Sequence, residues 1–267
     1  MRKNKILKVA MVVAGLFLTN LAAAAFAQKA AAPQKEPDPR VVLQEACNYL
    51  KSLQQFSFRS EVTYQQVYYQ GKKLEYGLDM DTFVKRPGRL MVKADGDIVN
   101  RRFFFNGKTI TLYDENAKIY ASMDVPPRIE AALKEANKKY GVRVALVDLA
   151  SPKLWELVSK KIRHSLYVGM SMVRGVPCYH LAFDGKDRHL EVWIEAGNKP
   201  LIRKILIENI KQQASPEWTA YLGQWNTKAR LADAMFNFVP PSGVKKVKFV
   251  APAIQPPTKG KKTGGGS

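Results

Sequence analysis

Apolar and polar residues alternate with a period of two along most of this chain. The alternation begins at Phe56, continues to Tyr68, and resumes at Leu74. A period of two places one set of side chains on one face of a β-strand. Turn sequences such as Arg86-Pro87-Gly88 and Asn106-Gly107 separate the apolar runs and indicate an antiparallel meander. After the first two strands, further strands are expected around 90–94, 98–105, 108–114 and 117–123.

Helical spacing replaces the alternation in three segments. Asp38 and Pro39 are suited to the cap and first position of a helix over 39–53. A second helix is expected over 127–139, and Ser151 with Pro152 begins a third over 152–161. Strands are then predicted at 163–173, 176–184, 188–195, 200–211, 217–225 and 234–239. This order predicts an α+β chain dominated by one antiparallel sheet.

Both ends of the chain differ in composition from its middle. A basic start, an apolar run and Ala25-Phe26-Ala27 predict a signal peptide over 1–27, cleaved after Ala27, and hence an exported protein. Residues 28–38 have the composition of a linker, 39–250 form one predicted domain, and 251–267 are expected to be disordered.

The chain is strongly basic, with 43 Lys and Arg against 23 Asp and Glu and a net charge of +20. The predicted signal holds four basic residues and no acidic ones, so the exported chain would carry 39 against 23, or +16. Export argues against nucleic acid as the partner and leaves an anionic membrane surface as a candidate. A solvated basic surface without a specific partner is the alternative.

The stretch "CYHLAFDGKDRHLEVWIE" at 178–195 concentrates groups that bind metals or perform acid–base chemistry. Its Asp-Gly-Lys-Asp turn predicts a hairpin in which His180 faces Glu191, Ala182 faces His189, and Cys178 faces Trp193. These polar residues share one face, and the opposite face is apolar. Alternation alone therefore explains the pattern. A weak metal candidate remains, whose ligands would be Cys178, His180, His189 and Glu191.

Cys47 and Cys178 are the two cysteines, and an even number in an exported chain makes them a candidate disulfide. A bridge would require the first helix to pack on the Cys178 face of the hairpin. Burial of the apolar face beneath that helix would prevent this, so the disulfide stays open.

The order of these motifs resembles a family of predicted periplasmic proteins, domain of unknown function 2092, in the superfamily of the lipoprotein carriers LolA and LolB. The resemblance rests on "KRPGRLMV", "FFFNGKTITLYDENAKIYA", "VPCYHLAF", "LEVWIEAGNKPLIRKILI" and "FNFVPPSGVKKVKF". It implies a single curved antiparallel sheet, an unclosed β-barrel whose concave side is roofed by a helical lid. In the carriers that side takes up acyl chains, and they have no catalytic residues or cofactors to transfer.

The resemblance and the aromatic strand faces predict a non-enzymatic, monomeric periplasmic binding protein or carrier for a lipid or acylated protein. One alternative is an envelope sensor that reports ligand loading to a partner protein. Another is an enzyme or metal protein that uses the 178–191 hairpin. Lys85, Arg86 and Arg89 are the predicted contacts of an anionic headgroup. The predicted acyl-chain lining consists of Phe56, Phe58, Tyr64, Tyr76, Leu78, Met80, Leu90, Val92, Leu190 and Val192.

Overall fold

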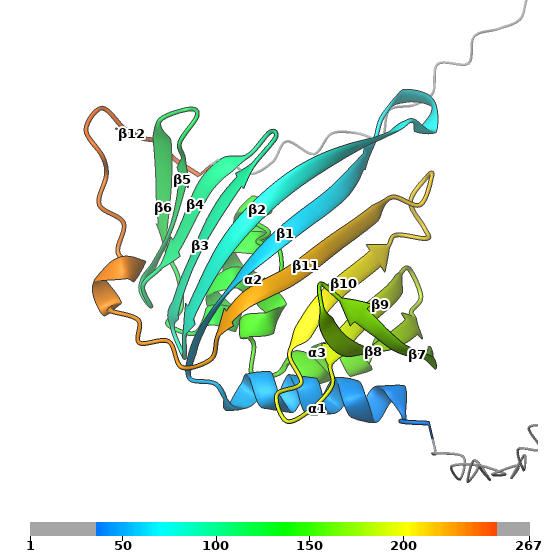
Figure 1. Cartoon of the computed structure of the whole chain (residues 1–267). Coiled ribbons are helices and arrows are strands. Elements are labelled where there is room, and N and C mark those ends of the chain that lie inside the picture. The colour runs from blue at the N-terminus through cyan, green and yellow to red at the C-terminus, as the bar shows by residue number, and fades with distance from the viewer. Residues whose placement is uncertain (1–35, 250–267) are drawn as a thin grey trace, which may run out of the picture. The chain divides into compact units, whose positions relative to one another are not determined.

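The computed structural model describes residues 36–249 of the chain (Figure 1). The predicted signal peptide at 1–27, most of the linker and the tail at 251–267 lie outside the described residues. Within 36–249, no helix combines the length and the apolar character that a membrane span requires.

The strands form one sheet, as predicted, and the sheet has twelve of them. The first six are β1 Gln55–Val67, β2 Lys73–Lys85, β3 Arg89–Gly96, β4 Asn100–Phe105, β5 Thr109–Asp114 and β6 Ile119–Asp124. The others are β7 His164–Val173, β8 Val176–Asp184, β9 His189–Glu195, β10 Ile202–Glu208, β11 Glu217–Asn226 and β12 Lys245–Lys246. The spatial order is β12-β6-β5-β4-β3-β2-β1-β11-β10-β9-β8-β7, so β7 and β12 are the two edges. The sheet curves strongly and does not close into a barrel (Figure 1).

Three α-helices pack on the concave side: α1 Pro39–Ser52, α2 Ile129–Tyr140 and α3 Leu154–Ser159. Asp38 caps α1 by accepting a hydrogen bond from the Arg40 N–H (2.8 Å), which confirms the predicted start. Gly141 ends α2 in a left-handed conformation that glycine adopts without steric cost. Short 3-10 segments lie at Tyr69–Gly71, Val147–Ala150 and Asp233–Phe236.

The core lies between the helices and the concave face. Apolar side chains of α1 and α2, among them Leu50 and Ala132, pack against strand residues such as Phe56 and Phe105, all fully buried. A second, smaller cluster lies on the convex face and joins Val173 and Cys178 to Trp193. The predicted helical lid is therefore confirmed, and the β7–β9 region has packed side chains on both faces.

The predicted strand at 234–239 is wrong. Asp233–Phe236 forms a 3-10 turn in which Phe236 is fully buried. Phe238 then packs within 5.3 Å of the rings of Phe104 and Tyr113 on the convex face, measured between centroids. The alternation of apolar residues at 234–239 therefore reflects aromatic packing against a face of the sheet and not the backbone pairing of a strand. The arm then continues to β12, which pairs in parallel with β6.

The hairpin of β8 and β9 exists, but its register differs from the prediction by two residues. Asp184 is opposite His189, Ala182 is opposite Glu191, and His180 is opposite Trp193. A shift of two keeps every side chain on its predicted face. Leu181 and Val192 are buried under the helices, as expected.

Candidate functional site

The helices leave one end of the concave face partly uncovered. Strand register aligns five side chains in a row across β2, β1, β11, β10 and β9 at this end. They are half-buried, whereas the residues of the neighbouring row on β1, β11, β10 and β9, which include Val62 and Ala220, are buried. Half-buried Leu78 projects from the same face of β2. We call these six residues the apolar band: Tyr76, Tyr64, Trp218, Ile207, Leu190 and Leu78.

Aromatic contacts organise the β1–β2 part of the band. The rings of Tyr64 and Tyr76 stack with centroids 5.7 Å apart. The Tyr76 hydroxyl lies 2.6 Å from the Tyr68 hydroxyl, and this hydrogen bond raises the pKa of Tyr76. Burial raises the pKa of Tyr64. Both phenols therefore stay neutral at physiological pH, and the polar edge of the band consists of hydroxyls that are free of charge.

Two band residues, Ile207 and Trp218, were not among the predicted lining residues. The alternation in β11 already places Trp218 on the face of Ala220 and Leu222. What the sequence does not give is the pairing of β11 with β1, which places Trp218 opposite Tyr64 although 154 positions separate them. Residues this distant in sequence become neighbours only through the topology of the sheet.

The structure divides the predicted acyl-chain lining into two groups. Tyr64, Tyr76, Leu78 and Leu190 belong to the apolar band. The other six are at most 3% exposed and are packed into the core beneath the helices. In this structure they have no surface open to a ligand: Phe56, Phe58, Met80, Leu90, Val92 and Val192.

The three predicted headgroup cations interact with the chain itself. Lys85 Nζ lies 2.7 Å from Asp233 Oδ1, and Arg89 Nη2 lies 4.0 Å from the other oxygen of the same carboxylate. Arg86 donates to the carbonyls of Leu50 (2.7 Å) and Ala150 (2.9 Å), and its burial lowers its pKa.

Their location also opposes the predicted role. They flank the β2–β3 turn, where β2 ends at Lys85. Tyr76 of the apolar band lies nine residues earlier in β2, about 30 Å away at the rise of an extended strand. The assignment of these cations to a headgroup at the mouth of the site is therefore corrected. Each stabilises a turn or helix end.

The weak metal candidate also changes on the observed register. His180 Nε2 lies 2.6 Å from Glu191 Oε2, and His189 Nδ1 lies 2.7 Å from Asp184 Oδ1. His180 and His189 are four ladder positions apart, about 13 Å along the backbone, and their rings flank the Glu191 carboxylate, which lies 2.6 Å from His180 Nε2 and 3.5 Å from His189 Nε2. Within 36–249, no group of three His, Cys, Asp or Glu residues is arranged to hold a metal ion. The two-residue shift in register separates the ligands.

The cysteines are free and lie in different clusters. Cys47 belongs to α1 and is buried in the main core. Cys178 is buried in the convex cluster with Trp193. Burial raises the pKa of Cys47 to about 12 and that of Cys178 to about 11. The candidate disulfide is therefore not formed, because the first helix covers the apolar face of the hairpin and Cys178 points the other way.

A small cavity of about 160 Å³ lies away from the apolar band, beside the start of α2. Arg86, Arg128 and Glu130 contribute to its lining. The lining of this cavity carries charges of both signs. The Ile129 N–H at the start of α2 already donates to the carbonyl of Pro87 (3.1 Å). It is too small for an acyl chain.

Comparison with known proteins gives a family. The family model described as "Predicted periplasmic protein (DUF2092)" matches residues 40–250. No curated protein matches the chain.

Several solved structures are distantly similar to the chain. LprF from Mycobacterium bovis is 14% identical, with a TM-score of 0.47 over 74% of this chain and 97% of that one. The Mycobacterium tuberculosis lipoprotein LppX is 12% identical, with a TM-score of 0.42 over 73% and 98%. A LolA superfamily protein from Nitrosomonas europaea is 12% identical, with a TM-score of 0.35 over 76% and 99%. Likenesses this distant carry no information about a ligand.

Proposed function

The chain belongs to the DUF2092 family of predicted periplasmic proteins, and from this premise we propose that it binds the acyl chain of an envelope lipid or acylated protein on the apolar band, without catalysing a reaction. The family description confirms the expected compartment. Acyl chains in that compartment belong to membrane lipids and to acylated proteins, which need an apolar surface to leave the bilayer.

The observation that carries the proposal is the exposure of the band itself. The helices cover much of the concave face down to a few per cent exposure, whereas the six large apolar residues of the band, which lie together at one end, stay half-buried. An apolar surface of this kind that continues a core is typical of a binding site. Curvature of the sheet makes the surface concave, so a ligand would contact several strands at once.

The energetics allow useful affinity. Complete burial of a sixteen-carbon chain would contribute roughly 12 kcal/mol at about 0.8 kcal/mol per methylene. Ordering and association costs cancel a large part of this sum. A dissociation constant of about 1 µM corresponds to about 8 kcal/mol, so a chain that contacts the band over most of its length would bind in the micromolar range.

Cations for an anionic headgroup are available at this end of the sheet. Lys72 and Lys73 are exposed in the β1–β2 hairpin, close to Tyr76 in sequence, and Lys211 is exposed in the β10–β11 loop. That loop lies against the hairpin, because a methyl group built on Gly71 would lie 3.9 Å from the Ala214 side chain. These lysines replace Lys85, Arg86 and Arg89 as the proposed headgroup contacts.

The test is titration of the protein with a fluorescent sixteen-carbon fatty acid. Wild type is expected to bind saturably, and Leu78→Glu or Ile207→Glu is expected to weaken binding at least tenfold by placing a charge on the band. Val41→Glu is the control, because Val41 is 48% exposed on α1 at the other end of the molecule. Absence of saturable binding by wild type, or equal binding by folded band variants, would refute the proposal.

A further inference from the structure

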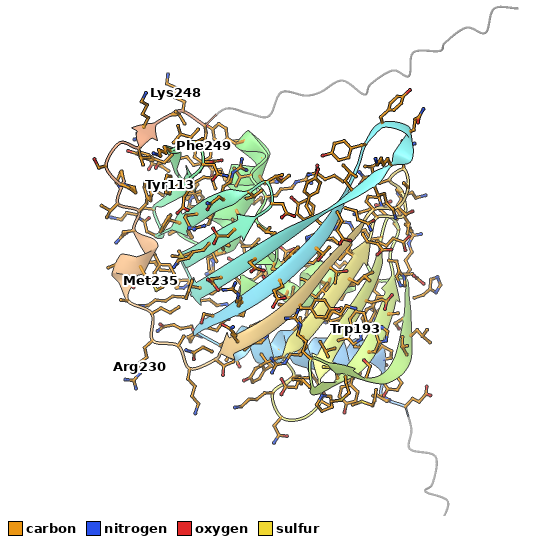
Figure 2. All side chains as sticks on the ribbon, turned by 45° about the horizontal axis from the view of Figure 1, so that its top comes forward. Tyr113, Trp193, Arg230, Met235, Lys248 and Phe249 are labelled. Carbon is orange, nitrogen blue, oxygen red and sulfur yellow. The ribbon has the colours of Figure 1, made fainter. Side chains whose placement is uncertain are left out.

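Among the described residues, one edge of the sheet is covered by another segment of the chain and the other edge is not. The β6 edge is covered by the C-terminal arm, where the Lys245 N–H donates to Lys118 O (3.0 Å) and the Val247 N–H donates to Tyr120 O (2.8 Å). In Figure 2, Phe249 of this arm and Tyr113 lie toward one end of the sheet, and Trp193 lies toward the other end. Within 36–249, nothing pairs with the outer edge of β7. Its free N–H and C=O groups are a template for another strand.

Strand β7 has few of the features that normally protect an edge. Edge strands are commonly short or carry lysine or proline. This strand is ten residues long and contains no Lys, Arg, Pro, Asp or Glu. Four of its apolar side chains are at least half exposed: Leu166 (61%), Val168 (50%), Met170 (53%) and Met172 (65%). Methionine side chains adapt to different partner surfaces.

The exposed side chains occupy both faces of the strand. A bulge interrupts the pairing with β8 between Tyr167 and Gly169. Leu166 is opposite Ala182 and therefore lies on the convex face, whereas Met170 is opposite Tyr179 and lies on the other. An occupant that contacts all of them has to run along the edge and present side chains to both faces. An extended polypeptide does this, because its side chains alternate.

The segment that leads into β7 is positively charged, and Glu36 is an acidic group near Tyr167 of the strand. No Asp or Glu occurs between Leu157 and Phe183, and Lys160, Lys161 and Arg163 are exposed just before the strand. The neighbouring carboxylate of Asp184 is hydrogen-bonded to His189 (2.7 Å). An occupant would therefore be favoured by acidic residues at the end that lies beside Arg163.

Other occupants fit less well. A lipid bilayer would bury the apolar side chains but would leave the edge N–H and C=O groups without partners, at a cost of several kcal/mol for each buried group. A second copy would bring two basic segments near one another. The linker at 28–38 holds two lysines, Lys29 and Lys35, against Glu36 and Asp38, so it carries no net negative charge to complement the edge.

We propose that β7 is a docking edge that binds an extended, acidic segment of a partner protein as a thirteenth strand. Main-chain hydrogen bonds along the edge would provide affinity, and the apolar side chains of both faces would select alternating apolar residues in the partner. Strand β8 separates the docking edge from β9, the last strand of the apolar band, so partner binding and acyl binding do not compete for the same residues.

The test is selection of random twelve-residue peptides, displayed on phage, against the full exported protein. The enriched peptides are expected to alternate apolar residues with others and to contain Asp or Glu toward one end. A synthetic copy should bind in solution and slow amide hydrogen exchange in β7. The double variant Met170→Lys, Met172→Lys should weaken binding at least tenfold. The control is Ile98→Lys, because Ile98 in the β3–β4 turn has the same 53% exposure as Met170.

Each alternative occupant gives a distinct result. Failure to enrich a consensus, a basic consensus, or binding that the β7 variant leaves unchanged would overturn the proposal. Sedimentation with phosphatidylglycerol vesicles that depends on Met170 and Met172 would identify a membrane surface instead. A dimer in analytical ultracentrifugation that the double variant dissociates would identify a second copy. Faster peptide binding after removal of residues 28–35 would identify the linker as the occupant of the edge.

Discussion

Arg174, in the turn between β7 and β8, donates two hydrogen bonds to the carboxylate of Glu61 in β1, at 2.5 and 2.7 Å. Four strands separate β1 from β7 in the sheet, so the end of the hairpin must fold back across the convex face to make this contact. The Arg174 guanidinium also lies 4.5 Å from the ring centre of Tyr221. The ion pair thus holds the β7–β8 turn over the convex cluster, in which Cys178 is buried.

We expect Glu61→Gln to loosen this hairpin without unfolding the protein. Both side chains are about half exposed, so the loss in global stability should stay below about 1 kcal/mol. Amide exchange in residues 172–178 should accelerate. Arg174 lowers the pKa of Glu61, so the stabilisation is present above the unfolded pKa of about 4.3 and is lost as pH falls through the lower folded value. Glu135→Gln, which breaks the exposed Glu135–Lys139 pair of α2, is the control. Unchanged exchange at the hairpin would contradict the prediction.

Replacement of Arg86 should be far more costly. Its guanidinium satisfies carbonyls at the end of α1 and before α3 and lies 5.2 Å from the ring centre of Phe56. Arg86→Met would leave buried carbonyls unpaired, with an expected loss of about 3–5 kcal/mol. The measurement is the urea concentration at the midpoint of unfolding, compared between proteins whose unfolding transitions have the same slope. Arg230→Met is the control, because Arg230 is exposed and projects from the surface (Figure 2). A similar midpoint for both variants would show that Arg86 is not structural.

Local patterns in the sequence predict most of the secondary structure. The period-two runs give β1 to β11, with ends displaced by at most a few residues, and Asp38 and Gly141 mark real helix ends. These features depend on neighbours in the chain. The segment at 234–239 has the same local pattern, but its Phe238 packs against Tyr113 and Phe104 of another part of the fold. Local alternation cannot distinguish the two cases.

The site was less predictable, because it depends on register and on long-range partners. The turn at 184–187 is compatible with two hairpin registers that place the same side chains on each face. The observed register is shifted by two residues from the predicted one, which moves His189 farther along the ladder from His180. Lys85 and Arg86 have no partner close in the sequence, because their partners Asp233 and Ala150 are 148 and 64 positions away. How far the helices extend over the concave face determines whether Phe56 or Tyr64 is open, and nothing in the sequence of β1 encodes that.

The thiols provide a test of burial. With a pKa of about 11 or 12, each cysteine would be a thiolate in about one molecule in a thousand or fewer at pH 8. Native protein should therefore react very slowly with Ellman's reagent, and Cys47 and Cys178 should react together after denaturation, giving two thiols per chain. No thiol release in denaturant without reductant would show that a disulfide had formed. A fast native thiol would place one of them at the surface.

The Asp184–His189 pair predicts a pH dependence. Its hydrogen bond raises the pKa of His189 above the ordinary value of 6.5. The pair therefore stabilises the fold fully below about pH 6.5, and the contribution is lost as pH rises through the higher folded pKa. In NMR titration of the imidazole protons, Asp184→Asn should lower the midpoint of His189, while Glu135→Gln should leave it unchanged. A midpoint that is the same in wild type and Asp184→Asn would exclude the pair.

Two buried hydroxyls in the concave core give the final prediction. Thr82 and Ser60 project from neighbouring strands beneath the helices, and neither hydroxyl has a hydrogen-bond partner among the described residues. Burial of an unpaired hydroxyl costs free energy, so Thr82→Val should leave stability unchanged or raise it by about 1 kcal/mol. Thr111 is the matched control: it is similarly buried in β5, but its Oγ1 lies 2.8 Å from Ser122 Oγ.

Thr111→Val would leave the Ser122 hydroxyl unpaired and should lower the free energy of unfolding by about 1 kcal/mol. Urea denaturation of the two valine variants beside wild type measures the difference directly. The opposite signs are the essential result, since the two substitutions remove the same atoms from similarly buried strand positions. Equal losses would mean that the Thr82 hydroxyl has a partner such as a bound water. The concave core would then contain water despite its apolar lining.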